Sequence, residues 1–254
     1  ILRSEREAKP AGAALVEYMS GSGRIIVTTM RFETMAKRRI ELLRKLMAWL
    51  GVRLGEPVLM PDGILDDSGR LKEALVLTGI PANDAAKDLQ TDFIGESSAA
   101  PVKDAITSVK PSGKKPFDLK WATMKADENG VFDLGKADAK CSGGCAAYLA
   151  FRIYSPRPLD QLLAQPDLPK INLSAGSSGA VKILLNGKTI IENRGGKPFS
   201  ADMYKIQALP LKQGWNLLLI KTTAKGSAPR AAVRFDCADQ EFITTLRSSL
   251  ELQK

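Results

Sequence analysis

The run SSGAVKILLNGKTIIEN, from Ser177 to Asn193, decides the fold of this chain. Asn186-Gly187 stands between two apolar and β-branched runs, and both residues tolerate the positive φ that a type I′ turn requires. An Asn-Gly pair in this setting is the strongest short-range signal for a β-hairpin. The run therefore predicts two antiparallel strands, Val181 to Leu185 and Lys188 to Asn193.

Short apolar or alternating runs continue on both sides of this hairpin. From about Leu119 onward they are separated by turn residues, which is typical of two packed antiparallel sheets. The other expected strands are Leu119 to Met124, Gly130 to Leu134, Ala146 to Tyr154, Lys170 to Ala175, Tyr204 to Leu209, Trp215 to Thr222 and Ala231 to Phe235. The predicted fold is mainly β, a jelly-roll β-sandwich over residues 119–254, with a terminal helix or tail from Gln240 to Leu252.

Two different segments precede the expected sandwich. Residues 1–51 predict a small α/β segment, in which a hairpin around Gly21-Ser22-Gly23 is followed by an amphipathic helix that begins near Thr34. Residues 52–118 are interrupted by many prolines and glycines, which is typical of a linker. One short helix is expected within that linker, from Asn83 to Asp92, with Asn83 as its N-cap.

The composition of the chain excludes several classes of function. The chain has 254 residues, 44% of them hydrophobic and 26% charged, which is typical of a globular protein. No apolar run approaches the roughly 18 residues of a membrane span, so no membrane-spanning segment is expected. The sequence contains no histidine, which excludes Ser-His-Asp, Cys-His and HExxH catalysis within this chain. It opens at Ile1 without a methionine or a signal pattern, and we expect a piece of a longer polypeptide.

The charge balance points to an anionic partner without identifying its class. Lys and Arg number 37 against 28 Asp and Glu, a formal net charge of +9. Nucleic acid, anionic lipid and anionic polysaccharide all attract such a surface. Nucleic acid is disfavoured here, because the sequence lacks a reader motif and a platform of interleaved arginines and aromatics.

The three cysteines are Cys141, Cys145 and Cys237. The CxxxC spacing has no second ligand pair, so a metal site is not expected. If the strand after Cys145 paired with the strand ending at Cys237, these two cysteines would lie side by side. A Cys145–Cys237 disulfide is therefore preferred, with Cys141–Cys237 or three buried thiols as alternatives. A disulfide would imply an oxidising compartment.

Three runs, Ser177 to Lys188, Glu192 to Arg194 and Leu211 to Lys221, resemble a galactose-binding-like jelly-roll module. That module occurs in large secreted bacterial polysaccharide-degrading proteins, including β-galactosidase-like members of glycoside hydrolase family 2. The resemblance covers roughly residues 119–238. In the family the first run usually reads SDDGVKVWLNG. Ser178 and Gly179 replace its two aspartates here, which removes carboxylates that would coordinate calcium or a sugar.

The opening hairpin and helix resemble the end of a glutamine-amidotransferase-like α/β domain. Together the two resemblances imply the C-terminal region of an exported bacterial glycoside hydrolase, secreted or periplasmic, whose catalytic carboxylates precede Ile1. They imply a non-catalytic carbohydrate-binding or accessory module, without a cofactor, whose partners are a polysaccharide and the upstream catalytic domain. The basic surface would suit sulfated or uronic glycans. The alternative is a purely structural sandwich that packs on a catalytic domain or mediates oligomerisation.

Candidate site residues follow from what sugars need. Sugar-binding sandwiches use an aromatic face against the pyranose ring, and polar side chains for its hydroxyls. The loop from Glu192 to Phe199 combines both with a flexible Gly195-Gly196 pair, although a solvated loop has the same composition. The residues expected to bind ligand are Glu192, Asn193, Arg194, Lys197, Phe199 and Tyr204. Adjacent carboxylates such as Asp66-Asp67 and Asp127-Glu128 stand in predicted turns, and no catalytic role is expected for them.

Overall fold

A computed structural model describes residues 15–20, 23–28, 63–66, 68–160, 170–195, 198–237 and 246–250. The chain divides into two compact units, Ile1–Leu59 and Met60–Lys254. In the first unit β1 (Leu15–Ser20) pairs antiparallel with β2 (Gly23–Thr28), which confirms the predicted hairpin. The helix expected after Thr34 lies outside the described residues, and the assignment of this unit to an amidotransferase-like domain stays a prediction.

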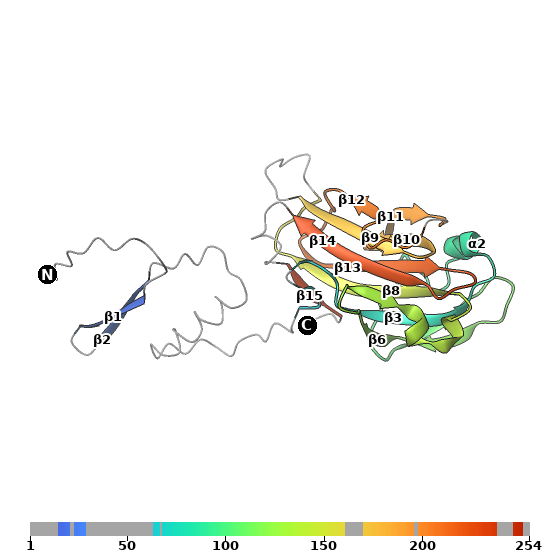
Figure 1. Ribbon diagram of the computed structural model, residues 1–254, viewed down its shortest axis with the longest axis horizontal. Coiled ribbons are helices and arrows are strands. Elements are labelled where there is room, and N and C mark those ends of the chain that lie inside the picture. Colours follow the sequence, from blue (N-terminus) through green and yellow to red (C-terminus); the bar gives the residue numbers. More distant parts are fainter. Residues whose placement is uncertain are drawn as a thin grey trace. The chain divides into compact units, whose positions relative to one another are not determined.

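The described regular structure of the second unit is mainly strand, with short helices between some strands (Figure 1). Its elements are β3 (Glu73–Pro81), α2 (Ala85–Gln90), β4 (Ile106–Val109), β5 (Phe117–Lys120), β6 (Ala122–Lys125), β7 (Val131–Asp133), α3 (Leu134–Ala137), the 3-10 turn η1 (Ala139–Cys141), β8 (Cys145–Ser155), β9 (Ile171–Ser177), β10 (Ala180–Leu185), β11 (Lys188–Asn193), β12 (Tyr204–Ile206), β13 (Gly214–Thr223), β14 (Arg230–Cys237) and β15 (Arg247–Ser249). The predicted Asn186-Gly187 turn joins β10 to β11 with φ of 50° and 78°.

Two antiparallel sheets form the sandwich. The large sheet has the order β11-β10-β13-β8-β3-β6, and β15 also pairs with β8. The small sheet has the order β12-β9-β14-β7, and β4 and β5 form a separate hairpin. This arrangement confirms the mainly β fold class and the β-sandwich. Its jelly-roll connectivity stays a prediction.

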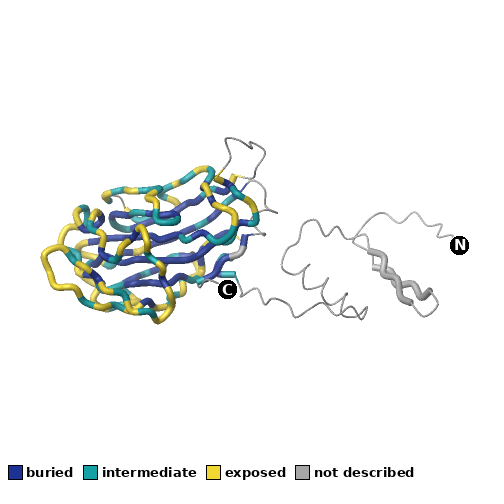
Figure 2. Tube along the Cα trace, turned by 180° about the vertical axis from the view of Figure 1, so that it is seen from behind, coloured by how far each residue is buried: buried dark blue, intermediate teal, exposed yellow. Residues whose placement is uncertain are grey.

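The core between the sheets follows from strict alternation along the strands. On β8, Leu149 and Phe151 join the main core, whereas Tyr148 and Ala150 face the opposite side. Figure 2 shows that the central strands are buried along most of their length, with exposed residues gathered in the connections. Phe151 meets Phe235 of the small sheet edge to face, with ring centroids 6.1 Å apart. Aromatic contact across the interior therefore helps to fix the two sheets together.

A second apolar cluster covers the outer face of the large sheet. Phe93, Val109 and Trp121 pack there against Leu77 of β3 and Tyr148 of β8. Because both faces of this sheet are covered, its central strands are buried on both sides and are mostly apolar. The residues of this cover lie between positions 85 and 121, a region predicted from the sequence to be largely a linker.

The predicted division at residue 119 is therefore corrected. Glu73–Pro81 is not linker but strand β3, which pairs with both β8 and β6 inside the large sheet. Gly79, with φ of 84°, lies where the β3–β8 register shifts between Leu77 and Ile80. Gly79 thus occupies a bulge, and the strand continues to Pro81, which was predicted to be a breaker.

The short helix predicted from Asn83 to Asp92 is confirmed as α2. Its N-cap is Asp84, not Asn83, because the Asp84 carboxylate accepts hydrogen bonds from the backbone N–H groups of Ala86 and Lys87. At the other end of the chain, β15 replaces the expected terminal helix or tail over Arg247–Ser249. Its pairing with β8 at Ile153 supplies backbone partners that a short helix would have found locally.

The predicted Cys145–Cys237 disulfide is wrong, because the disulfide joins Cys141 to Cys145, whose Cα atoms are 4.9 Å apart. Cys145 begins β8 in the large sheet, whereas Cys237 ends β14 in the small sheet, so the two strands never pair. The turn η1 instead brings Cys141 back beside Cys145. All three cysteine side chains are buried in the main core.

Candidate functional site

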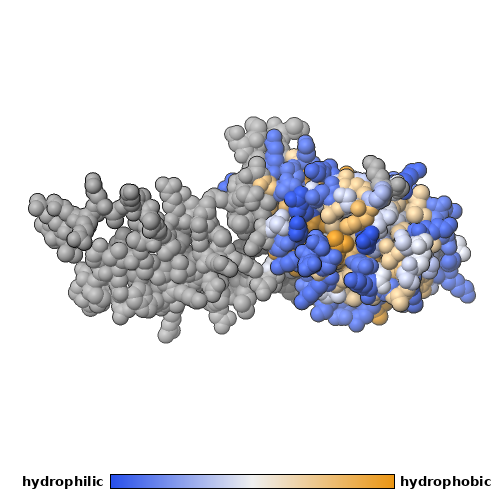
Figure 3. Space-filling model, in the orientation of Figure 1, coloured by the Kyte–Doolittle hydropathy of each residue, from blue (hydrophilic) through white to orange (hydrophobic). Residues whose placement is uncertain are grey.

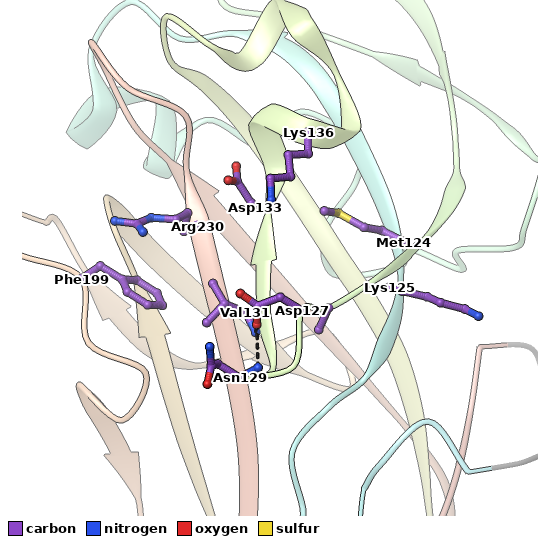
Figure 4. A pocket seen from close by; sticks show the side chains of 10 residues that line it. Met124, Lys125, Asp127, Asn129, Val131, Asp133, Lys136, Phe199 and Arg230 are labelled. Atoms are coloured by element: carbon purple, nitrogen blue, oxygen red, sulfur yellow. Dashed lines mark hydrogen bonds between the residues drawn. The ribbon is translucent and has the colours of Figure 1, made fainter.

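A cleft of about 400 Å³ lies on the outer face of the small sheet, where β7 pairs with β14 (Figure 4). In this register Asp133 is opposite Arg230, while Phe132 and Ala231 point into the core. The pleat therefore aims the polar members of both strands outward. We call this site the β7–β14 cleft. Its lining residues are Met124, Lys125, Ala126, Asp127, Asn129, Val131, Asp133, Lys136, Phe199 and Arg230.

Phe199 reaches the cleft because the backbone of the segment before β12 packs closely against β9. Gly176 faces this segment, and a Cβ there would lie 2.1 Å from the carbonyl oxygen of Ser200. Only glycine admits such a close backbone approach. The half-buried ring of Phe199 is thereby held with its centroid 5.0 Å from Cζ of Arg230. Figure 4 shows both side chains on the same side of the cleft.

Arg230 is fixed at its backbone and open at its guanidinium group. Its N–H donates to Oγ of Ser178 at 2.8 Å, and its carbonyl accepts from the Ser178 N–H at 3.0 Å. Within the described ranges, the guanidinium contacts the Phe199 ring and forms no ion pair. Stacking on an aromatic face leaves the in-plane N–H donors of an arginine available to a ligand.

The two carboxylates of the cleft already serve the backbone. Oδ1 of Asp127 accepts hydrogen bonds from the N–H groups of Asn129 and Val131, both at 2.9 Å. Oδ1 of Asp133 accepts from the N–H of Gly135 at 3.2 Å and caps α3. Asp127 thus shapes the turn before β7, as expected for an Asp in a turn. These bonds orient both carboxylates at the edge of the cleft.

Of the residues predicted to bind ligand, Phe199 lines the β7–β14 cleft. Glu192 and Asn193 instead lie on β11 at the edge of the large sheet. Glu192 accepts a hydrogen bond from Nε2 of Gln90 in α2, and Asn193 accepts from the N–H of Gly195 at 3.0 Å. Arg194 is exposed beside them, and Lys197 lies outside the described residues.

Tyr204 is also separate from the cleft. It pairs with Ala175 on the inward-facing row of β9, and its ring packs against the main core. Burial raises the pKa of its phenol above the ordinary value. The ring therefore serves packing between the sheets.

Most residues of the cleft were not predicted from the sequence, above all Arg230, Asp133 and Lys136. One signal was available on the strand from Arg230 to Cys237. Its apolar residues Ala231, Val233 and Phe235 alternate with Arg230, Ala232 and Arg234, which marks an outward polar face. Local spacing could not show which other residues of the chain lie beside that face.

The corner formed by Ser177, Ser178 and Gly179 has a structural role. Oγ of Ser177 lies 2.8 Å from Oγ1 of Thr222, and Oγ of Ser178 accepts from Arg230. A Cβ on Gly179 would lie 2.1 Å from the carbonyl oxygen of Thr223. The described residues contain no cluster of three or more cysteine or carboxylate side chains placed to hold a metal ion.

Polar residues cover much of the face of this unit seen in Figure 3, around a smaller apolar area. Among the described helices, none has the length and apolar character needed to cross a membrane. The two helices α2 and α3 have six and four residues.

No protein-family profile matches this chain, and no curated protein matches its sequence. Solved structures similar to it include the β-glucosidase of Kluyveromyces marxianus in complex with glucose, at 16% identity and a TM-score of 0.31. That match covers 52% of this chain and 15% of the β-glucosidase. A β-glucuronidase from an uncultured Clostridium species is 12% identical, with a TM-score of 0.32, and the match covers 68% of this chain and 30% of that protein. The chain thus spans less than a third of either enzyme.

Proposed function

We propose that the second unit is a non-catalytic carbohydrate-binding module and that the β7–β14 cleft holds its ligand. The observation that carries this proposal is the pairing of a half-buried aromatic face, Phe199, with the open guanidinium of Arg230. An aromatic face covers the apolar side of a pyranose ring, and fixed polar groups select its hydroxyls. Asn129, Asp133 and Lys136 supply such groups around the same cleft.

The carboxylates of the cleft support binding more than hydrolysis. Glycoside hydrolysis requires two carboxyl groups, one to donate a proton and one to act as nucleophile or base. Asp127 and Asp133 each use one oxygen to hold a turn or a helix start. We therefore place the hydrolytic step in the upstream domain of a parent glycoside hydrolase, as the resemblance to family 2 proteins implies.

The parent protein is proposed to be exported, to the bacterial periplasm or the medium. The Cys141–Cys145 disulfide supports this location, since disulfides persist in oxidising compartments. There the module would hold the enzyme close to a polysaccharide. Tethering raises the local concentration of substrate at the catalytic domain without adding any contact to it.

Affinity electrophoresis of the full chain through gels containing neutral or acidic polysaccharides tests this function. Phe199→Ala should abolish the retardation that at least one of these polysaccharides causes. Arg194→Ala is the matched control, because Arg194 lies beside the edge strand β11 and outside the cleft. Absence of retardation by every polysaccharide at low salt would overturn the proposal.

The alternative, a purely structural sandwich, is favoured by one observation. Ile106 and Val102 are exposed to 71% and 47%, near the β4–β5 hairpin that covers the large sheet. A contiguous exposed apolar patch marks a surface that packs on another protein, and these two side chains are the candidates for such a patch. Ile106→Lys should leave glycan retardation unchanged if the module binds sugars. If the module is purely structural, the same variant should change its sedimentation behaviour.

A further inference from the structure

A second hollow adjoins the β7–β14 cleft on the outer face of the small sheet. It has a volume of about 120 Å³, and we call it the Arg234 hollow. Its lining residues are Arg70, Asn129, Gly130, Ala201, Asp202, Ala232, Val233 and Arg234. Asn129 lines both hollows, so the two form one continuous polar surface.

The strand β14 sets the direction of this surface. Arg230 and Arg234 both face outward, with Ala232 between them on the same face. Their Cα atoms are about 13 Å apart, because an extended strand rises about 3.3 Å per residue. That spacing exceeds the width of one sugar ring. Because the Ala232 side chain is small, the surface of the sheet is hollowed between the two arginines.

Arg70 adds a further guanidinium group to the Arg234 hollow, at the end of the surface away from Arg230. It forms an antiparallel bridge with Arg234, and its stem packs against Gly130. A Cβ on Gly130 would lie 3.3 Å from Cβ and Cδ of Arg70, and its φ of 77° favours glycine. Gly130 therefore keeps the Arg70 stem in place beside Asn129.

The charged side chains that line the two hollows are five lysines and arginines and three aspartates, so their net charge is positive. Arg234 is paired with Asp202, Nη2 to Oδ2 at 2.9 Å. Arg70, Lys136 and Arg230 form no ion pair within the part of the chain that the structure describes. Of the three carboxylates, Asp127 and Asp133 accept hydrogen bonds from backbone N–H groups, and Asp202 pairs with Arg234. A ligand that crosses both hollows thus meets unpaired cations at each end.

We infer that the ligand is an acidic polysaccharide, uronic or sulfated, that lies along β14 and spans both hollows. This inference rests on the proposed carbohydrate-binding function and specifies its substrate class. Arginine is suited to the task, because its planar fork donates two parallel hydrogen bonds to a carboxylate or sulfate group. Single-stranded nucleic acid fits less well, since its successive bases require several aromatic platforms and the two hollows offer Phe199 alone.

The test compares acidic polysaccharides with their own neutralised forms. The full chain is titrated with polygalacturonate, alginate and chondroitin sulfate, and with each polymer after carboxyl reduction or desulfation. At least one acidic polymer should bind about tenfold more tightly than its neutralised form, with an affinity that falls as salt rises. Equal binding to both forms of every bound polymer would overturn the acidic class and leave the proposed function standing. Binding to none of them would overturn both, and tighter binding to single-stranded DNA would overturn the inference.

Two variants separate local contacts from net charge. Arg230→Gln and Arg70→Gln should each weaken binding of the preferred acidic polymer by about tenfold. Lys114→Gln removes the same charge from an exposed site before β5 and should leave the affinity unchanged. Equal losses in all three variants would show diffuse attraction and overturn the two-hollow site. Circular dichroism spectra identical to that of the unsubstituted chain would confirm that the variants fold.

Discussion

Nζ of Lys221 lies 2.9 Å from Oε1 of Glu96, and the two side chains are 0% and 3% exposed. Lys221 belongs to β13, whereas Glu96 lies in the segment that covers the large sheet after α2. Glu96 also accepts from Tyr148 at 2.7 Å and from Lys182 at 2.6 Å. Burial lowers the pKa of Lys221, and the neighbouring Glu96 opposes that shift. The Glu96 carboxylate thus connects the segment that covers the large sheet to side chains on three of its strands.

Glu96→Gln should destabilise the fold by about 3 kcal/mol, because it leaves the buried Lys221 without its counter-charge. Urea unfolding at neutral pH measures the change. Asp104→Asn is the matched control, since Asp104 pairs with Lys120 at the surface, where both side chains are more than half exposed. That variant should leave the unfolding midpoint unchanged. Equal midpoints for the two variants would contradict the role assigned to Glu96.

Acid should weaken the fold partly through Asp66. Burial raises the pKa of this carboxyl, but hydrogen bonds from the Ser68 hydroxyl and from the N–H groups of Arg70 and Ser68 outweigh burial and lower it below 3.8. The unfolded chain then binds more protons, so this stabilisation is present above pH 3.8 and is lost as pH falls through the folded pKa. Asp66→Asn keeps an acceptor and should flatten the acid limb of stability measured by urea unfolding. An unchanged acid limb would contradict this assignment.

Gly187→Ala should destabilise the β10–β11 hairpin by more than its φ of 78° alone explains. A Cβ at this position would lie 2.2 Å from the carbonyl oxygen of Ser97. Gly113→Ala is matched in φ, at 70°, but has open space around it. The control should cost about 1 kcal/mol and the Gly187 variant clearly more. Thermal unfolding of both variants decides whether the contact with Ser97 is as close as described.

Gly176→Ala should displace Phe199 while leaving the sandwich folded. Its Cβ would collide with the backbone of Ser200, so the segment before β12 must lift from β9. Amide hydrogen exchange across residues 199–202 should accelerate, and the affinity for any bound glycan should fall. Gly143→Ala is the control, since no atom lies within 4 Å of its Cβ. Unchanged exchange in the Gly176 variant would contradict this placement of Phe199.

The disulfide gives a direct chemical prediction. Without reduction, a tryptic digest should contain Cys141 and Cys145 within one peptide, lighter by two hydrogens than its reduced form. Replacing both residues by serine should cost about 2 kcal/mol, because the bond closes a short loop. A cross-linked pair of peptides containing Cys237 would contradict the pairing seen here.

The strands of the sandwich were predictable where a local pattern marks them. The Asn186-Gly187 turn and the long apolar runs around Phe151 and Ile220 give the hairpin and the central strands of the large sheet within a residue or two. β3 was missed because residues 52–118 were predicted to be a linker, with Pro81 among its breakers. In the fold Gly79 occupies a bulge and Pro81 a strand end, and neither role is visible from local sequence.

The candidate cleft was harder to predict than the fold. Phe199 was identified from composition alone, but its partner Arg230 stands 31 positions later and meets it through sheet pairing. The cysteine prediction failed for the same reason. Sequence spacing does not reveal which sheet a strand joins, and Cys145 and Cys237 belong to different sheets. Long-range pairing, rather than residue chemistry, limited what could be inferred.

A Cβ on Gly63 would lie 3.4 Å from Oγ of Ser248, so the first and last described segments of the second unit lie next to each other. Folded units with neighbouring ends tolerate insertion into a surface loop of an unrelated host protein. The second unit therefore has the geometry for such an insertion, because its described ends would not force the two sides of the host loop apart.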